Sequence, residues 1–402
     1  MKDTSRPKLW VAVLLLGSLT MFPSLSIDMY LPAFPMIEEE LQTNTSFTQL
    51  SLTFFLIGLS VGQFCIGPLS DVHGRRLPLL IGLTCYSASS LLCAVSINIE
   101  MLIVFRFIQG FAGAASIVIC NAVVRDLYSG TQLIKFFSLL SLVTGAGPIF
   151  APIVGAQLLR ITDWSGIFIV LSGLCVCILL FVMVLLPETL PAERRSEGGI
   201  KNTLITYRRI VADRQFMGYA LSRGLVVAAM FAYISGSPFL IQNIYDASPQ
   251  LFGLLFAMNG LGFIIAAQIT GRLAGKIDAE KLLVSGLVIA ATGGIAFLLL
   301  ILADAGLFAV LPPLFLIVAS VGVVNTASTS LAMQNQGQSA GSASALIGLI
   351  SFIAGGIASP FVGLVGGETA LPMGLVIAFA DIGAVLCYVV LVRRTMVQNV
   401  QA

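Results

Sequence analysis

Long runs of apolar residues alternate with short polar segments along the whole chain. A helix of about 20 apolar residues crosses the hydrocarbon core of a bilayer. The pattern therefore predicts an all-α membrane protein with twelve membrane-spanning helices. Their expected ranges are 9–31, 47–67, 77–97, 101–122, 136–158, 165–187, 216–238, 251–270, 282–302, 307–330, 341–363 and 371–391.

The composition supports lipid as the main solvent of the chain. Of its 402 residues, 57% are hydrophobic and 10% are charged, whereas a soluble domain has about 25% charged residues. The mean hydropathy is +1.00, which leaves too little polar surface for a water-soluble globule. The net charge is only +2, so we do not expect nucleic acid as a partner.

The distribution of basic residues predicts the orientation. With the N-terminus inside, all but three of the 21 Lys and Arg residues fall in the termini or in the even-numbered connections. The exceptions are Arg106 and Arg223, within expected spans, and Arg160, in an outside connection. Since cytoplasmic connections carry an excess of Lys and Arg, we expect a multi-pass protein of the cell membrane with both termini in the cytoplasm.

The longest polar stretch, from Pro187 to Gln215, divides the twelve spans into six and six. We expect an N-terminal six-helix bundle over residues 1–187, a cytoplasmic linker over 188–215 and a C-terminal six-helix bundle over 216–402. Within the linker, residues 203–213 combine basic and apolar positions. This pattern predicts an amphipathic helix on the membrane surface.

A polar loop is expected between the second and third spans, from Gly67 to Arg76, with Asp71, Gly74 and Arg75 inside it. It resembles the signature G-x-L-x-D-x-x-G-R-R of the major facilitator superfamily. The resemblance implies that these five residues form a cytoplasmic gate, in which a carboxylate and arginines latch neighbouring helices in one state of the transport cycle. The alternative is a positively charged turn with no switching role.

An arginine stands within the fourth span, where a charge is costly unless it faces a partner or a cavity. The stretch from Arg106 through Gln109 and Gly110 resembles the facilitator motif R-x-x-Q-G-x-x-x-A, whose arginine is implicated in proton coupling. The alternative is that Arg106 extends to the outer interface of the membrane.

The fifth span contains Gly145, Gly147, Pro148 and Gly155. The run resembles the motif G-x-x-x-G-P-x-x-G of drug:proton antiporters in the same superfamily, which implies export. Val143 and Ala151 stand where the motif has flanking glycines, and this departure puts the closeness of helix packing in doubt. The alternative is ordinary packing of helices through small residues.

The first span ends in a carboxylate, Asp28, followed by Tyr30, Leu31 and Pro32. An unpaired carboxylate inside an apolar helix is protonated or needs a cation. The pattern D-x-Y-L-P-A-x-P resembles the Bcr/CflA group of drug-resistance transporters. We expect Asp28 to carry the coupled proton, with Arg106 as the opposing charge; the alternative is a structural group at the helix end.

The expected substrate cavity is mainly apolar and aromatic, with Met29, Tyr30, Phe54 and Tyr233 as candidate lining residues. Each of them has the alternative of facing lipid or the helix core. Two polar candidates are Arg223 in the seventh span and Asp381 in the twelfth, which either pair with each other or line the cavity. Asp381 has the further alternative of a structural hydrogen-bonding group.

Several chemistries are excluded by what the sequence lacks. The one histidine, His73, lies in the expected loop, and the seven cysteines fall in apolar runs without metal-site spacing. There is no phosphate-binding loop for ATP and no catalytic cluster, so we expect neither an enzyme nor a metal or cofactor site.

The resemblance implies the major facilitator fold, with the two bundles around a central cavity. It also implies proton-coupled export of small amphipathic drugs or toxic compounds by alternating access. The alternative is a transporter of an ordinary metabolite, such as a sugar, an amino acid or a small organic anion. The expected partners are a small-molecule substrate, protons and membrane lipid, and the expected state is a monomer.

Overall fold

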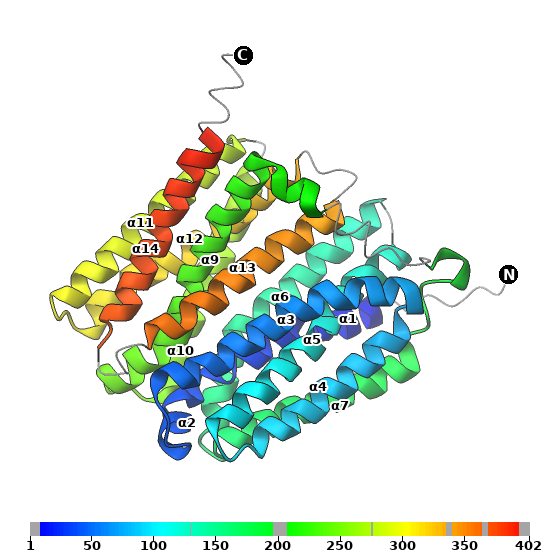
Figure 1. Cartoon of the computed structure of the whole chain (residues 1–402), viewed down its shortest axis with the longest axis horizontal. Helices are drawn as coiled ribbons and strands as arrows, with labels where there is room; N and C mark the ends of the chain where they lie inside the picture. Colours follow the sequence, from blue (N-terminus) through cyan, green and yellow to red (C-terminus); the bar gives the residue numbers. More distant parts are fainter. Residues whose placement is uncertain are drawn as a thin grey trace. The chain divides into compact units, whose positions relative to one another are not determined.

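The computed structural model describes residues 9–128, 130–195, 207–274, 276–334, 340–363 and 369–393. Within these ranges the elements are helical, apart from an isolated bridge between Ala274 and Ile277. The first half of the chain contains α1 (Leu9–Asp28), η1 (Leu31–Ala33), α2 (Phe34–Glu40), α3 (Thr45–His73), α4 (Arg76–Ala94), α5 (Ile99–Leu127), α6 (Gly130–Leu158), α7 (Trp164–Leu185) and η2 (Ala192–Arg194). The second half contains α9 (Arg214–Pro238), η3 (Phe239–Ile244), α10 (Pro249–Leu273), α11 (Ala279–Leu302), α12 (Leu307–Met333), α13 (Ala340–Val362), α14 (Leu371–Cys387) and η5 (Tyr388–Arg393) (Figure 1).

The expected membrane-spanning pattern is confirmed. Eleven helical segments in the described part of the chain are long and apolar enough to cross a membrane. The remaining expected span falls on α6, whose apolar stretch among the described residues is Ala146–Leu158. Large apolar side chains such as Val184, Phe308 and Phe379 are exposed on the helices, as is expected where lipid is the solvent.

Polar residues just before the helices explain where several of them begin. The Asn98 side chain accepts a hydrogen bond from the backbone N–H of Met101 at the start of α5. Asp213 accepts two such bonds at the start of α9, and Ser248 caps α10 ahead of Pro249. These side chains satisfy backbone N–H groups that have no partner within their helix.

The chain divides into two compact units. One contains Met1–Ala33 and Ile57–Gly199, and the other contains Phe34–Leu56 and Ile200–Ala402. The division therefore falls within α3 as well as in the linker. The bundle boundaries expected from the sequence stay a prediction.

Helices pack closely within each unit. In the first unit α4 lies against α5 and α7, and α1 lies against α6; in the second unit α9 lies against α13 and α14, and α11 lies beside α12 and α14 (Figure 1). The closest approaches occur at glycines. A Cβ atom at Gly58 would lie 2.2 Å from the carbonyl oxygen of Phe107, and one at Gly322 would lie 2.3 Å from that of Phe263. Small residues thus let the backbones of spanning helices meet.

Candidate functional site

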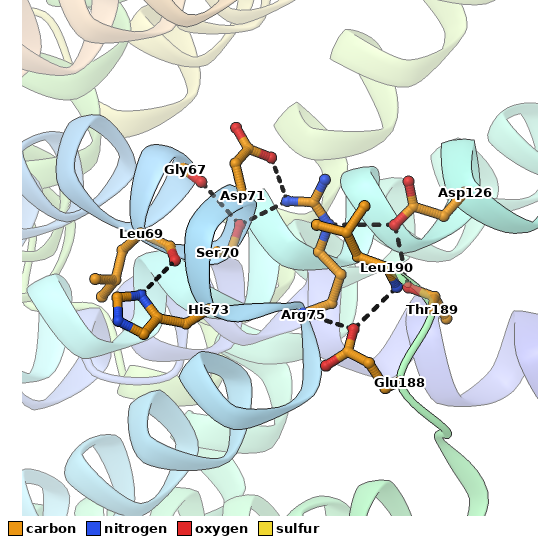
Figure 2. Close-up of polar contacts among 10 residues, drawn as sticks. All are labelled: Gly67, Leu69, Ser70, Asp71, His73, Arg75, Asp126, Glu188, Thr189 and Leu190. Atoms are coloured by element: carbon orange, nitrogen blue, oxygen red, sulfur yellow. Dashed lines mark hydrogen bonds and ion pairs between the residues drawn. The ribbon is translucent and has the colours of Figure 1, made fainter. Parts of the chain in front are cut away.

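The guanidinium of Arg75 is the centre of a polar cluster at the end of α3 (Figure 2). Its Nη1 donates to Asp71 Oδ1 at 2.6 Å and to Ser70 Oγ at 2.8 Å. Its Nε donates to Asp126 Oδ2, near the end of α5, at 3.2 Å. The Arg75 side chain is only 10% exposed, whereas that of Asp71 is 52% exposed. We call these four residues and Glu188 the Arg75 cluster.

Glu188, which follows α7, binds the start of α4 through main-chain donors. Its Oε1 accepts the backbone N–H of Arg75 at 2.8 Å and that of Leu190 at 3.0 Å, and its Oε2 accepts the N–H of Arg76 at 3.1 Å. A carboxylate at a helix N-terminus satisfies free N–H groups and complements the helix dipole. Burial alone would raise the pKa of Glu188, but these donors outweigh it and hold the pKa below its ordinary value.

Gly74 is the sharp turn that allows this contact. Its φ of +87° lies in the left-handed region that glycine adopts without strain. A Cβ atom at this position would lie 2.5 Å from Glu188 Oε2. A side chain at Gly74 would therefore both strain the backbone and displace the carboxylate.

The expected loop from Gly67 to Arg76 is wrong in its extent. Helix α3 continues to His73, so that Gly67, Pro68 and Asp71 are helical and only Gly74 and Arg75 separate α3 from α4. Pro68 is tolerated inside the helix because neighbouring groups in a membrane protein satisfy the freed backbone. Asp71 lies in the last turn of α3, and the turn at Gly74 brings Arg75, four residues later, back to its carboxylate.

Arg106 on α5 is fully buried. Its Nη1 donates to Gln109 Oε1 at 2.5 Å, and Gln109 donates in turn to Ser90 on α4 at 2.7 Å. The guanidinium carbon lies 4.7 Å from the ring centre of Tyr30 and 5.7 Å from that of Phe168. Aromatic faces attract a cation at such distances, so Arg106 is enclosed by rings and an amide rather than extending to the interface.

Asp28 is the last residue of α1 and is buried, with 4% of its surface exposed. It has no hydrogen-bond or ion-pair partner among the described residues, and no ion pair joins it to Arg106. The hydroxyl of Ser26, two residues before Asp28, forms a hydrogen bond with the hydroxyl of Tyr86 on α4. Asp28 and Arg106 therefore lie in the same unit without forming an ion pair.

The small residues of α6 lie against α1. A Cβ atom at Gly147 would lie 2.8 Å from the Cβ of Ser24, and one at Gly155 would lie 2.1 Å from the main-chain oxygen of Met29. Pro148 lies inside the helix between these two contacts, and Gly145 belongs to the same helix. The close packing that the departures from the motif put in doubt is therefore present at Gly147 and Gly155.

The candidate lining residues have different surroundings. Met29, Tyr30 and Tyr233 are buried, and Phe54 is 37% exposed. Tyr233 stacks on Phe256, with ring centres 5.4 Å apart, and accepts a hydrogen bond from Asn259. These contacts place Tyr233 in a well-packed position, and contact of the candidate residues with substrate stays a prediction.

Arg223 and Asp381 do not pair with each other. Arg223 Nε donates to Asn325 Oδ1 at 2.8 Å and its Nη1 donates to Thr329 Oγ1 at 3.2 Å. Asp381 is fully buried beside Gly294, and neither carboxyl oxygen has a hydrogen-bond partner in the described part of the chain.

The expected amphipathic helix is described only in part, since residues 203–206 lie outside the described ranges. Residues 207–212 are helical, with Arg208 and Arg209 exposed and Ile210 buried. Across the described residues, no group of three or more His, Cys, Asp or Glu side chains is placed to hold a metal ion.

Three residues of the Arg75 cluster were not among the expected gate residues. Glu188 was expected only in the linker, Ser70 only in the loop, and Asp126 only at the inner end of the fourth span. Glu188 lies 113 residues from Arg75 along the chain. The only available signal was its position directly after an apolar span, close to the basic cytoplasmic segments.

Comparison with known proteins agrees with this fold. A family model described as Major Facilitator Superfamily matches residues 16–359. A Bacillus subtilis protein named uncharacterized MFS-type transporter YdgK is 40% identical, with 98% of each chain covered. A Haemophilus influenzae protein named bicyclomycin resistance protein homolog is 30% identical, over 96% of this chain and 97% of that protein. The nucleoside transporter NupG has a similar structure, with a TM-score of 0.76, 13% identity and coverage of 96% and 100%.

Proposed function

Because the chain belongs to the major facilitator superfamily, a family of transporters rather than enzymes, we propose that it exports small amphipathic drugs or toxic compounds in exchange for protons. The observation that carries this proposal is the similarity, over nearly the whole length, to a protein named for bicyclomycin resistance. The proposed location is the cytoplasmic membrane, with both termini in the cytoplasm and the protein acting as a monomer.

Asp28 is the proposed proton carrier. The proposal is supported by its burial at the end of α1 and by the absence of an ion-pair partner among the described residues. A carboxyl group in such a position changes its proton affinity when water or a cation reaches it. In the proposed cycle, drug binding from the cytoplasm favours proton loss from Asp28. The outward switch releases the drug, and a new proton from outside resets the site.

Arg106 is the proposed opposing charge of this cycle. Its contacts with Gln109 and with the ring of Tyr30 hold it inside the same unit as Asp28. A small displacement of α1, which carries Asp28, would change the separation of the two charges. Their interaction is strong in a medium of low dielectric constant, so this displacement would alter the proton affinity of Asp28.

The Arg75 cluster is the proposed cytoplasmic latch, together with Gly67, Gly74 and Arg76. Two carboxylates bind Arg75, and Glu188 binds the main chain at the start of α4. The exposed carboxylate of Asp71 is the member that remains available to another partner. We propose that the halves 1–187 and 216–402, joined by the linker 188–215, rock between states that differ in the contacts of Asp71.

A metabolite transporter is the second candidate, and a small organic anion is the substrate that one observation favours. Arg223 lies within a spanning helix, and its guanidinium has no carboxylate partner among the described residues. A sugar, which has no anionic group, would give no reason for such a charge.

Purified protein in liposomes tests the proposal. The vesicles enclose a pH-sensitive dye, and bicyclomycin is added outside with and without a pH gradient. Proton-coupled export predicts drug accumulation only with the gradient, and a proton flux that depends on the drug. Drug entry that stops at equal concentrations on both sides, with or without the gradient, would instead indicate a uniporter and would refute proton coupling.

A further inference from the structure

Helices α9 and α12 bring a cation and two neutral acceptors together within the second unit. The Arg223 guanidinium donates to Asn325 at 2.8 Å and to Thr329 at 3.2 Å. All three side chains are partly exposed. Two hydrogen bonds to different residues fix the plane of the guanidinium, which is the orientation that decides what else it can bind.

No carboxylate in the described part of the chain forms an ion pair with Arg223. The described residues of α12 and α13, which both pack on α9, include no Asp or Glu. The neighbouring α14 carries Asp381, but the ion pairs of the described residues do not include one between Asp381 and Arg223. An arginine has five N–H donors, so three remain without a partner in the described part of the chain.

Arg223 lies well inside its spanning helix, where a charge without a counter-charge is costly. Arg223 lies about 13 Å along α9 from its first residue, and Asn325 lies about 12 Å from the last residue of α12. A charge at such a depth is costly unless it meets a partner of opposite charge or water. Arg106, by contrast, is fully buried among an amide and two aromatic rings, and offers no comparable access.

We propose that Arg223, held by Asn325 and Thr329, is a binding subsite for the carboxylate of a transported substrate. A planar carboxylate accepts two parallel hydrogen bonds from a guanidinium, and this pairing uses donors that Arg223 has free. The inference rests on the proposed transport of small molecules and adds the chemical class of substrate: drug-sized carboxylic acids rather than lipophilic cations.

Binding of one acid and its uncharged ester tests the subsite. The probes are nalidixate, a drug-sized aromatic carboxylate, and its methyl ester, measured on purified protein in a phosphate-free maltoside detergent. Wild-type protein is expected to bind the acid at least tenfold more tightly than the ester. Arg223→Gln removes the charge but keeps hydrogen-bonding capacity, and is expected to weaken binding of the acid at least tenfold while changing that of the ester less than twofold.

Two further variants separate the subsite from a general effect of charge or folding. Asn325→Asp supplies the missing carboxylate beside an intact arginine, and is expected to produce the same selective loss as Arg223→Gln. Arg160→Gln is the control for loss of charge: it removes an exposed arginine that follows α6. It is expected to leave the affinities for the acid and the ester unchanged. Gel filtration and thermal unfolding report whether each variant is folded.

The proposal is overturned if wild-type protein does not prefer the acid, or if Arg223→Gln and Asn325→Asp keep the preference. It is also overturned if these variants alter only the stabilisation by added phosphatidylglycerol, since Arg223 would then bind a lipid headgroup. Selective binding of the acid without gradient-driven transport would leave the subsite intact, and would refute only the proton coupling proposed above.

Discussion

Replacing Gly155 by alanine adds one methyl group where α6 meets Met29, the residue that follows α1. The new Cβ atom would lie 2.1 Å from the main-chain oxygen of Met29 and 2.8 Å from its carbonyl carbon. Ordinary contacts between such atoms are longer than about 3.2 Å, and a main-chain oxygen cannot rotate away as a side chain can. One of the two helices must therefore move by roughly 1 Å.

The expected cost follows from two opposing effects. Overpacking of this kind costs about 1–3 kcal/mol, whereas replacing glycine by alanine inside a helix gains about 0.5–1 kcal/mol. The net loss is then about 0–2.5 kcal/mol. We also expect a loss of transport, because the displaced main chain of Met29 directly follows Asp28.

Gly173 on α7 provides the matched control, since a Cβ atom there would meet nothing within 4 Å. Gly173→Ala is expected to be neutral or slightly stabilising and to transport normally. Thermal unfolding in detergent and vesicle transport are measured for both variants. If Gly155→Ala matches Gly173→Ala in both measurements, α1 and α6 are not in close contact, and the reasoning fails.

The remaining predictions concern the carboxylates. Asp71→Asn removes one charge-assisted bond to Arg75, worth about 1.5–3 kcal/mol when it is shielded from solvent and less at this exposed site. It should slow turnover while substrate affinity is kept; unchanged turnover would reject the latch. The N–H donors around Glu188 lower its pKa in the folded protein. They therefore stabilise the fold fully at a pH above the pKa of the unfolded chain, about 4.3, and this stabilisation is lost as the pH falls through the lower folded pKa. Wild-type protein should therefore lose thermal stability at acid pH, and Glu188→Gln should lose less, because it has no carboxylate at this position to protonate. Identical dependence of the melting temperature on pH in the two proteins would contradict the assigned contacts. Asp28→Asn should abolish gradient-driven export and the pH dependence of drug binding, measured in vesicles and by equilibrium binding. Uphill pumping by this variant would assign the proton to another group, with Asp381 or Asp126 next.

The spanning helices could be predicted because the signal for each lies within about 20 consecutive residues. The exception in the first half is instructive. Gly67 and Pro68 are turn-forming residues, yet α3 continues through them to His73. Local propensity was overridden by the packing of a long membrane helix, and Gly74 with its positive φ is the residue that makes the turn.

The candidate site was less predictable because its contacts join distant segments. Asp71 and Arg75 are only four residues apart, whereas the position of Glu188 after an apolar span does not indicate which segment it binds. Arg106 was expected as the charge that opposes Asp28, and the structure gives it Gln109 and two aromatic rings as neighbours instead. Neutral partners of this kind leave no complementary charge in the sequence by which to find them.

Three arginines of this chain show how the partner decides the role. Arg75 has two carboxylate partners, so replacing it leaves uncompensated negative charges and should change the balance between states. Arg106 is enclosed by an amide and rings, and lysine there would lose the planar cation that both contacts need. Among the described residues, Arg223 has two neutral acceptors, and three of its donors have no partner. Arg106 is fully buried, whereas Arg223 is partly exposed, so the charge of Arg223 is accessible to a ligand. By this reasoning, loss of Arg223 should alter which substrates are transported more than it alters stability.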